Sequence, residues 1–385
     1  MQTEQTNRPR AREAGIALGT LPPGPHNAIT DVEGVLVGHA TLISGEGPLV
    51  PGRGPVRTGV TAVVPHGGDL FAEKVPAAAE VFNGFGKTIG LVQVAELGQL
   101  ETPILLTNTL NVGKVADALV GYMIERHPAI GISANTVNPV VAECHDGYLN
   151  DIQGRHVGET EVRTALAEAA LSGGGPVAEG NVGGGTGMTA YGFAGGIGTA
   201  SRRLQEELGG WTVGALVQAN FGRRQNLTIG GAPVGRELPT EPTDARSVAE
   251  ERAERDRGSV IVVLATDAPL DARQLGRLAR RAAFGLARTG TYSGHGSGDL
   301  AIAFSTAERI PLRSAEPVRT VRVMAEESRA LDGLFLAAVE SVEEAVINAL
   351  FRARTMVGRD GHRREALPLE PTLAILRRHG AIRAP

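Results

Sequence analysis

Cysteine and aromatic residues are scarce in this sequence. Cys144 is the only cysteine among 385 residues, which excludes an intrachain disulfide and a zinc site built from cysteines. Aromatic residues make up 4%, so the core is expected to be aliphatic and rich in alanine. The nine histidines lack the spacings typical of metal sites, and the sequence predicts neither a metal nor another cofactor.

Long apolar runs and a strong excess of one charge are also missing. No run approaches the roughly 18 apolar residues that a membrane-spanning helix needs. Residues 1–28 lack the apolar segment of a secretory signal, and residues 1–15 are expected to form a disordered or docking arm. The net charge of −4 gives no indication of binding to nucleic acid or to a membrane surface. These absences predict a cytoplasmic protein without nucleic-acid or membrane partners.

Glycine and proline are abundant, and they separate short apolar runs into candidate strands and helices. Strands are predicted over 34–37, 59–64, 88–95, 103–107, 211–221, 260–265 and 300–304. Helices are predicted over 112–125, 161–172, 271–287 and 331–353. Strands followed by amphipathic helices favour a layered α/β architecture. The pattern alone leaves open a doubly wound sheet or sheets stacked between helices.

The junction between Gly258 and Ser259 is the most informative point in the sequence. A polar segment, 236–257, rich in Arg, Glu and Asp, ends there, and the apolar run 260–265 begins. A charged linker therefore meets a buried strand at a Gly-Ser pair, where a serine would stand if it became a new N-terminus. A hydroxyl nucleophile whose own α-amine serves as base is a known form of nucleophilic catalysis.

The glycine-rich segment 180–188 has two interpretations. It lacks the Gly-Lys-Ser/Thr ending of a phosphate-binding loop, and its glycines miss the spacing of a dinucleotide-binding loop. One hypothesis is a non-catalytic small-molecule-binding protein that uses residues 183–187. The other is a structural loop that packs closely against neighbouring backbone.

Several polar side chains stand at turns and strand ends. Tyr148 follows an Asp-Gly turn, and Asn220 closes a predicted strand, where its amide could donate to an oxyanion. A loop of small residues carries Ser297 and Asp299, which could reach a nucleophile with little steric obstruction. Each has a plain structural alternative: a core aromatic residue, a strand cap and an ordinary connection.

These segments recur in one order along the chain. They comprise 27–32, 37–39, 56–62, 106–109, 146–151, 180–188, 216–220, 258–259, 267–270 and 297–299. Together they resemble the DmpA-type aminopeptidases of peptidase family S58, which include L-aminopeptidase/D-esterases and β-peptidyl aminopeptidases. The resemblance implies an αββα sandwich, with residues 1–385 forming a single domain.

Self-cleavage between Gly258 and Ser259 is the main implication of the resemblance. It would leave an α-chain of residues 1–258 and a β-chain of residues 259–385. The resemblance also implies a homo-oligomer, expected to be a tetramer. The activity implied is that of an N-terminal serine aminopeptidase, which removes N-terminal residues from small peptides, amino-acid amides and esters through an acyl-enzyme on Ser259.

The resemblance also assigns roles to individual residues. Ser259 is the expected nucleophile, assisted by Ser297 and Asp299; some family members carry Glu where this chain has Asp299. Asn220 is expected to contribute to an oxyanion hole, and Tyr148 to line the site. The general base is either the freed α-amine, with an ordinary pKa of about 7.7–8.0, or the Ser297–Asp299 pair.

An aminopeptidase must also hold the substrate ammonium, and Glu143 and Asp146 are the candidates near Tyr148. An alternative activity is acyl transfer, as in ornithine acetyltransferases, which have a similar sandwich and self-process but use Thr where this chain has Ser259. The sequence leaves open a preference for L-α-, β- or D-aminoacyl substrates, because pocket shape decides it.

Overall fold

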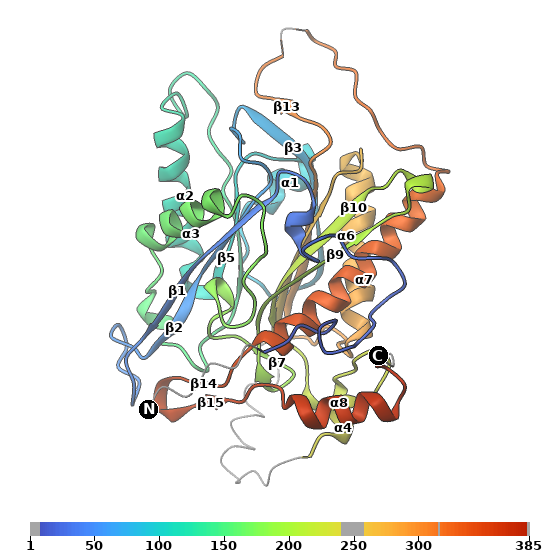
Figure 1. Cartoon of the computed structure of the whole chain (residues 1–385). Coiled ribbons are helices and arrows are strands. Elements are labelled where there is room, and N and C mark those ends of the chain that lie inside the picture. The colour runs from blue at the N-terminus through green and yellow to red at the C-terminus, as the bar shows by residue number, and fades with distance from the viewer. Residues whose placement is uncertain (1–7, 240–257, 315, 383–385) are drawn as a thin grey trace.

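Two β-sheets lie face to face between two pairs of helices (Figure 1). The computed structural model describes residues 8–239, 258–314 and 316–382. The first sheet has the order β1 (Leu36–Ser44), β2 (Val56–Val64), β5 (Ile104–Asn108), β6 (Val140–Cys144). The second has the order β13 (Ile310–Pro311), β3 (Glu73–Gly84), β12 (Gly298–Ser305), β11 (Ser259–Thr266), β10 (Thr212–Asn220), β9 (Gly196–Arg203), and β4 (Gln99–Leu100) pairs with β3.

Four long helices form the outer layers. Helices α2 (Val112–Arg126) and α3 (Glu159–Ser172) cover the first sheet, and α6 (Ala272–Arg288) and α7 (Arg329–Arg352) cover the second (Figure 1). The remaining elements are α1 (Leu91–Leu97), α4 (Val234–Glu237), α8 (Leu369–Arg378) and the ribbons β7 (Thr189–Ala190) with β8 (Phe193–Ala194) and β14 (Met356–Val357) with β15 (Arg363–Arg364). Short 3-10 helices span Ile29–Asp31, Thr109–Asn111, Ile152–Gly154, Gly183–Gly185, Glu206–Leu208, Arg224–Asn226 and Arg359–Gly361.

Burial on both faces explains why the central strand is uniformly apolar. Along β11, Val262 packs towards the helices, whereas Ile261 and Val263 pack between the two sheets. Successive side chains of a strand point to opposite faces, so a strand covered on both sides needs an unbroken apolar run. The first sheet behaves in the same way, with Leu105 facing α2 and α3 and Leu106 facing the second sheet. The predicted αββα sandwich is confirmed.

The helix predictions are confirmed to within about two residues at each end, but the strand predicted over 88–95 is wrong. Ile89 makes only an isolated bridge to Val141, and α1 begins directly afterwards. Gly90 and Gly98, which flank this helix, both have left-handed backbone, with φ of +89° and +64°. A seven-residue helix is too short to show helical periodicity, so its apolar residues imitate a strand.

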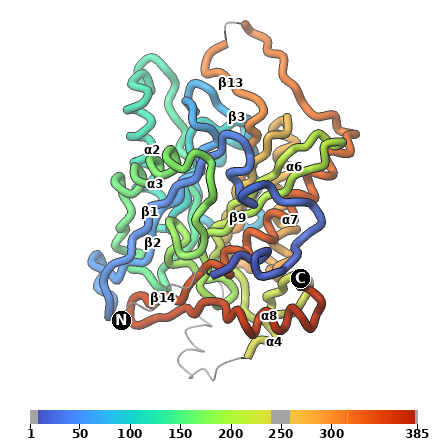
Figure 2. Tube along the Cα trace, in the orientation of Figure 1, coloured from blue at the N-terminus to red at the C-terminus, as the bar shows by residue number. Residues whose placement is uncertain are grey.

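The N-terminal segment docks on the second helical layer (Figures 1 and 2). Ala11 and Ile16 are fully buried, and Ile16 forms a bridge with Ile382 near the other end of the chain. The docking alternative therefore holds for residues 8–15, whereas residues 1–7 lie outside the described part of the chain. Residues 240–257 of the predicted polar linker also lie outside it.

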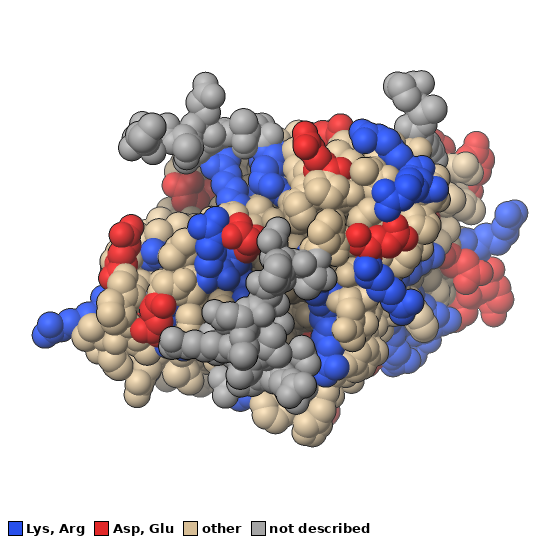
Figure 3. All heavy atoms as spheres, turned by 90° about the horizontal axis from the view of Figure 1, so that it is seen from below, with Lys and Arg blue, Asp and Glu red and all other residues tan. Residues whose placement is uncertain are grey.

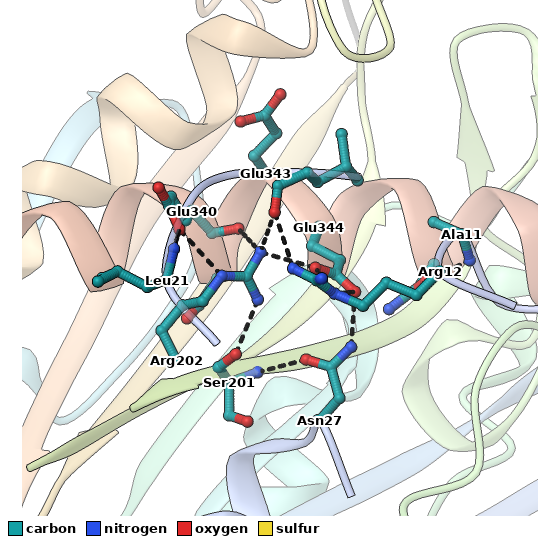
Figure 4. A network of polar contacts seen from close by, with 12 residues as sticks. Ala11, Arg12, Leu21, Asn27, Ser201, Arg202, Glu340, Glu343 and Glu344 are labelled. Carbon is teal, nitrogen blue, oxygen red and sulfur yellow. Dashed lines mark hydrogen bonds and ion pairs between the residues drawn. The ribbon is translucent and has the colours of Figure 1, made fainter. Parts of the chain in front are cut away.

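A buried ionic network fastens this segment to α7 (Figure 4). Arg202 of β9 is fully buried and pairs with Glu340 Oε2 at 3.1 Å and Glu344 Oε2 at 2.7 Å. Arg12 reaches Glu344 at 2.9 Å, and the side-chain amide of Asn27 donates to the same carboxylate. Buried charges persist only when they are paired and hydrogen-bonded, so the arm, the sheet and the helix depend on one another here.

The described surface carries charges of both signs. In the view of Figure 3, Lys and Arg side chains are interspersed with Asp and Glu side chains. None of the helices within residues 8–239, 258–314 and 316–382 is long and apolar enough to cross a membrane.

Candidate active site

Three neighbouring strands bring the predicted site residues together. Ser259 is the first residue of β11, the strand between β10 and β12. In the antiparallel pairing with β10 it lies opposite Asn220, and in the parallel pairing with β12 it lies beside Gly298. The sheet therefore gathers residues from three distant parts of the chain around one serine.

The Ser259 hydroxyl lies against the peptide bond that precedes it. Its Oγ is 2.7 Å from the Gly258 carbonyl oxygen, to which it donates. The Gly298 N–H points at both groups, 3.2 Å from Ser259 Oγ and 3.3 Å from the Gly258 oxygen. A backbone donor aimed at a carbonyl oxygen stabilises the negative charge that develops there when a nucleophile attacks.

Ser297 and Asp299 form a hydrogen-bonded pair beside this bond. Ser297 Oγ donates to Asp299 Oδ1 at 2.5 Å, so the aspartate reaches its serine although it is one methylene shorter than glutamate. The Val260 N–H donates to the same oxygen at 3.1 Å. Burial raises the pKa of Asp299, and the Ser297 hydrogen bond offsets part of the shift. A Cβ built on Gly258 would lie 3.5 Å from Ser297 Oγ, which places that hydroxyl next to the Gly258–Ser259 bond.

The side-chain amide of Asn220 is held in a defined orientation. Its Oδ1 accepts from the Thr189 N–H at 2.8 Å, and its Nδ2 donates to the His145 carbonyl oxygen at 3.0 Å. An amide NH₂ group carries two hydrogens, so Nδ2 keeps a second one that the described contacts do not use. The arrangement is compatible with the predicted oxyanion donor.

Tyr148 packs in a cluster with two residues near the C-terminus that the sequence analysis did not single out. Its ring stacks on His362, with 4.5 Å between the centroids, and the Arg364 guanidinium lies 3.6 Å above it. Arg364 Nε also donates to Thr189 Oγ1 at 3.3 Å. Since the Thr189 N–H binds Asn220, Tyr148 is connected to the Asn220 amide through the C-terminal ribbon β14–β15.

Glu143 lies close to the Ser259 region at the end of β6. Its Oε1 accepts from the Lys87 N–H at 2.8 Å, and the Thr109 hydroxyl donates to Oε2. A Cβ built on Gly86 would lie 3.6 Å from Glu143 Oε1, and one built on Gly298 would lie 2.7 Å from Gly86 Cα. A side chain at Gly298 would collide with the Gly86 backbone, so a glycine at 298 allows this close approach, which brings the buried carboxylate towards the strand end that holds Ser259.

Asp146 sits in a different environment. It is buried, and its Oδ1 accepts from Asn150 Nδ2 at 3.1 Å. Burial raises the pKa of Asp146 to about 7, so this carboxyl group titrates near neutral pH. The contacts of Glu143 thus lead to the strand end that holds Ser259, whereas Asp146 is hydrogen-bonded to Asn150.

The raised pKa of Asp146 predicts that the stability of the fold changes with pH near neutrality. Because the pKa of Asp146 in the folded chain lies above the ordinary value of 3.8, the protonated carboxyl group stabilises the fold relative to the ionised one. This contribution to the free energy of unfolding is complete below about pH 4 and is lost as the pH rises through about 7. Asp146→Asn removes this titration, so the fall in Tm from pH 5 to pH 8 is expected to be smaller than in the wild type. Asp117→Asn, at an exposed position of α2, is the control. An equal fall in the wild type and Asp146→Asn would contradict the prediction.

A sequence model of peptidase family S58 matches residues 27–364. The chain belongs to peptidase family S58. It is therefore a hydrolase of the aminopeptidase type, as the sequence resemblance implied. Membership of this family favours the aminopeptidase hypothesis over the acetyltransferase and small-molecule-binding alternatives.

Several relatives resemble the chain over nearly its whole length. The beta-peptidyl aminopeptidase BapA of Sphingosinicella microcystinivorans is 44% identical over 383 residues, which cover 98% of this chain and 94% of that protein. The structure of the PH0078 protein from Pyrococcus horikoshii OT3 has a TM-score of 0.88 and 51% identity, covering 97% of this chain and 99% of that one. The structure of the L-aminopeptidase D-Ala-esterase/amidase of Ochrobactrum anthropi is described as a new variant of the Ntn hydrolase fold. It has a TM-score of 0.87 and 44% identity, covering 98% of this chain and 100% of that one.

The glycine-rich segment of this S58 peptidase packs as a structural loop. The amides of Gly183 and Gly184 donate to Thr41 Oγ1 at 2.8 Å and Thr61 Oγ1 at 3.1 Å, and the Gly185 amide donates to the Val182 carbonyl oxygen. A Cβ on Gly184 would lie only 2.3 Å from the side chain of Gln218. These amides are already bound, so the loop does not form the phosphate cradle that the alternative hypothesis requires.

Cys144 is a buried thiol next to the Ser259 backbone. It is fully buried, and its Sγ lies 3.4 Å from the Ser259 carbonyl oxygen. Burial, reinforced by the charge of Glu143, raises the pKa of this thiol and keeps it protonated. Within the described ranges, no group of three or more His, Cys, Asp or Glu side chains is placed to bind a metal ion.

Proposed function

We propose that the chain is a self-processing N-terminal serine aminopeptidase that cleaves itself before Ser259 and then uses Ser259 as its nucleophile. The observation that carries the proposal is the position of Ser259 Oγ. It lies against the Gly258 carbonyl, with the Gly298 N–H directed at both groups. The Ser297–Asp299 pair lies on the same side, beside Gly258.

Self-cleavage follows from attack of Ser259 Oγ on the Gly258 carbonyl carbon. The Oγ–C bond forms as the C–N bond breaks, and the nitrogen keeps its hydrogen and takes a second proton, becoming the α-amine of Ser259. Water then hydrolyses the ester, which releases the Gly258 carboxylate and restores the hydroxyl. Gly258 suits this step because it places no side chain between the two serines, Ser259 and Ser297.

Peptide hydrolysis repeats the same chemistry on a substrate. Ser259 Oγ attacks the carbonyl carbon of the N-terminal residue, the amine of the leaving peptide takes a proton, and water releases the acyl group. The Gly298 N–H and the Asn220 amide are the donors for the oxyanion. The base is either the freed α-amine of Ser259 or the Ser297–Asp299 pair, whose carboxyl group has a raised pKa.

A denaturing gel of purified, active protein tests this proposal. The β-chain should appear as a band of about 13 kDa, the share of residues 259–385 in 40.0 kDa, and its N-terminal residue should be Ser259 by mass spectrometry. Full-length chain as the only species in a fully active sample would refute self-processing.

We propose Glu143 as the group that holds the substrate ammonium. Its carboxylate is buried close to Gly86 and Gly298, and each of its oxygens accepts a single hydrogen bond in the described contacts, so lone pairs remain for an ammonium. Such a charge-assisted bond contributes about 1.5–3 kcal/mol.

Glu143→Gln is therefore expected to lower kcat/KM for aminoacyl amides by roughly 10–100-fold. The variant preserves the shape of the side chain and should still self-cleave, because the precursor presents no ammonium at this position. Steady-state kinetics on an aminoacyl p-nitroanilide and on its analogue without the amino group give the measurement. An equal loss on both compounds would rule out ammonium binding.

Substrate preference and assembly complete the proposal. The relatives named above act, by their names, on beta-peptidyl, L-aminoacyl and D-Ala ester or amide substrates, so profiling against β-, L-α- and D-aminoacyl amides and esters defines the preference of this chain.

We also propose a homotetramer, for which light scattering should return the mass of four 40.0 kDa chains. The cytoplasmic location stays a prediction.

A further inference from the structure

Asn83, the last residue but one of β3, connects this strand to the turn that carries Ser297. Its Nδ2 lies 3.2 Å from the Gly294 carbonyl oxygen and 3.0 Å from that of His295, and it also donates to the Ser297 carbonyl oxygen. The two hydrogens of one side-chain amide therefore face three carbonyl oxygens of a single turn, and at least one hydrogen is shared between two of them. Neither Asn83 nor β3 stood out in the sequence.

The turn between α6 and β12 needs such a donor. Ser297 N–H closes it onto the Gly294 oxygen at 2.9 Å, and Ser293, at its start, has left-handed backbone with φ of +52°. A left-handed conformation is costly for a residue other than glycine and persists where surrounding contacts enforce it. Three carbonyl dipoles that converge also repel one another unless a hydrogen-bond donor lies between them.

The contact with Ser297 has a direct consequence for the site. The Ser297 carbonyl and the Gly298 N–H are the two ends of one peptide group, and in a planar trans peptide they point in opposite directions. By holding the carbonyl, Asn83 sets the direction of the N–H that lies 3.2 Å from Ser259 Oγ. A hydrogen bond accepted by the carbonyl also polarises the peptide and strengthens its N–H as a donor.

The register of the sheet adds a second constraint. Asn83 pairs with Asp299 across β3 and β12, and the pairing shifts by one residue immediately after Asp299. Such irregularities re-aim side chains next to active sites. Asn83 thus acts on the two groups of β12 and its turn that lie beside the Gly258–Ser259 bond, the Gly298 N–H and the Ser297–Asp299 pair.

We propose that Asn83 is a positioning residue that orients the Ser297–Gly298 peptide towards Ser259, both for self-cleavage and for substrate hydrolysis. The inference rests on the proposed function of Ser259. In the self-cleaved protein Asn83 belongs to the α-chain and the turn to the β-chain, so their hydrogen bonds hold the oxyanion donor in place across the two chains.

The test compares Asn83→Asp and Asn83→Ala with the control Asn138→Asp. The aspartate side chain has nearly the shape of the amide but no N–H, whereas alanine removes the group without adding charge. Asn138 is a matched control because its Nδ2 donates to the Gly90 carbonyl oxygen at 2.9 Å, at the opposite end of β6 from Glu143. We expect kcat, counted per cleaved chain, to fall by roughly 10–100-fold in both Asn83 variants, with KM within about twofold of the wild type.

Self-cleavage should slow in parallel, while Asn138→Asp should keep the wild-type kcat and rate of cleavage. A kcat unchanged by both Asn83 variants, or a loss confined to KM, would overturn the inference. The Tm of each variant shows whether the fold is intact. If Tm falls no more in the Asn83 variants than in Asn138→Asp, the loss of kcat reflects positioning and not unfolding. Ser259→Ala separates a failure of the proposed function from a failure of the role of Asn83. Activity in Ser259→Ala refutes the proposed function. An inactive Ser259→Ala together with a fully active Asn83→Asp refutes only the role of Asn83.

Discussion

Ser259→Ala is expected to yield an intact 385-residue chain without aminopeptidase activity. The variant removes the hydroxyl that lies against the Gly258 carbonyl, and it leaves the Gly298 N–H and the Ser297–Asp299 pair in position. Loss of the nucleophile in serine hydrolases lowers kcat by roughly 10⁴-fold or more. The two effects should appear together, because one hydroxyl carries out both reactions.

The measurement combines a denaturing gel with kinetics on aminoacyl p-nitroanilides. Ser305→Ala is the matched control, because Ser305 is also a buried serine of this sheet and stands at the far end of β12, where its Oγ donates to the Ala268 carbonyl oxygen at 2.6 Å. It should self-cleave and keep its activity. Cleavage at residue 258 in Ser259→Ala, or activity close to that of the wild type, would refute the assignment of Ser259.

Glu344→Gln is expected to lower the free energy of unfolding by about 3–5 kcal/mol. Glu344 is fully buried on α7 and binds Arg202, Arg12 and Asn27 (Figure 4). Glutamine has nearly the same size but no charge, so the buried Arg202 guanidinium loses one of its two carboxylate partners. Glu340 remains as a carboxylate partner of Arg202, but the loss of a partner by a buried charge is far more costly than the loss of a surface pair.

Urea denaturation at pH 7 measures this effect, with Glu206→Gln as the control. Glu206 pairs with Arg203, the neighbour of Arg202, but both side chains are more than half exposed, so its loss should cost less than about 1 kcal/mol. Equal unfolding midpoints for the two variants would show that the buried network does not stabilise the fold.

Local apolar patterns predicted much of the layered fold. The run 260–265 predicted the central strand, because a strand buried on both faces must be apolar throughout. The helix of residues 331–353 was predicted from its long apolar stripe. In contrast, β3 was missed because its 12 residues include a proline and three alanines, which have low strand propensity. Its burial depends on the neighbouring strands, which no local pattern contains.

The site was predictable only in part, for the same physical reason. Ser259, Ser297, Asp299 and Asn220 were identified by their side chains, and the sheet brings all four to one end of β10, β11 and β12. The Gly298 N–H was missed because every residue except proline carries such a group, and only its direction makes it a donor to Ser259. Asn83 was missed because its partners are three backbone carbonyls in a turn more than 200 residues away.

The sequence by itself determined the most prominent junction of the chain, Gly258–Ser259, because a polar segment, a glycine and an apolar strand are local features. Only the tertiary structure decided what surrounds that bond. Parallel pairing of β11 with β12 brings residues 39 positions apart into contact, so that the Gly298 N–H meets Ser259 Oγ. The direction of a backbone N–H and the close packing of glycines arise from the pairing of distant strands. Composition and residue spacing along the chain therefore do not reveal them.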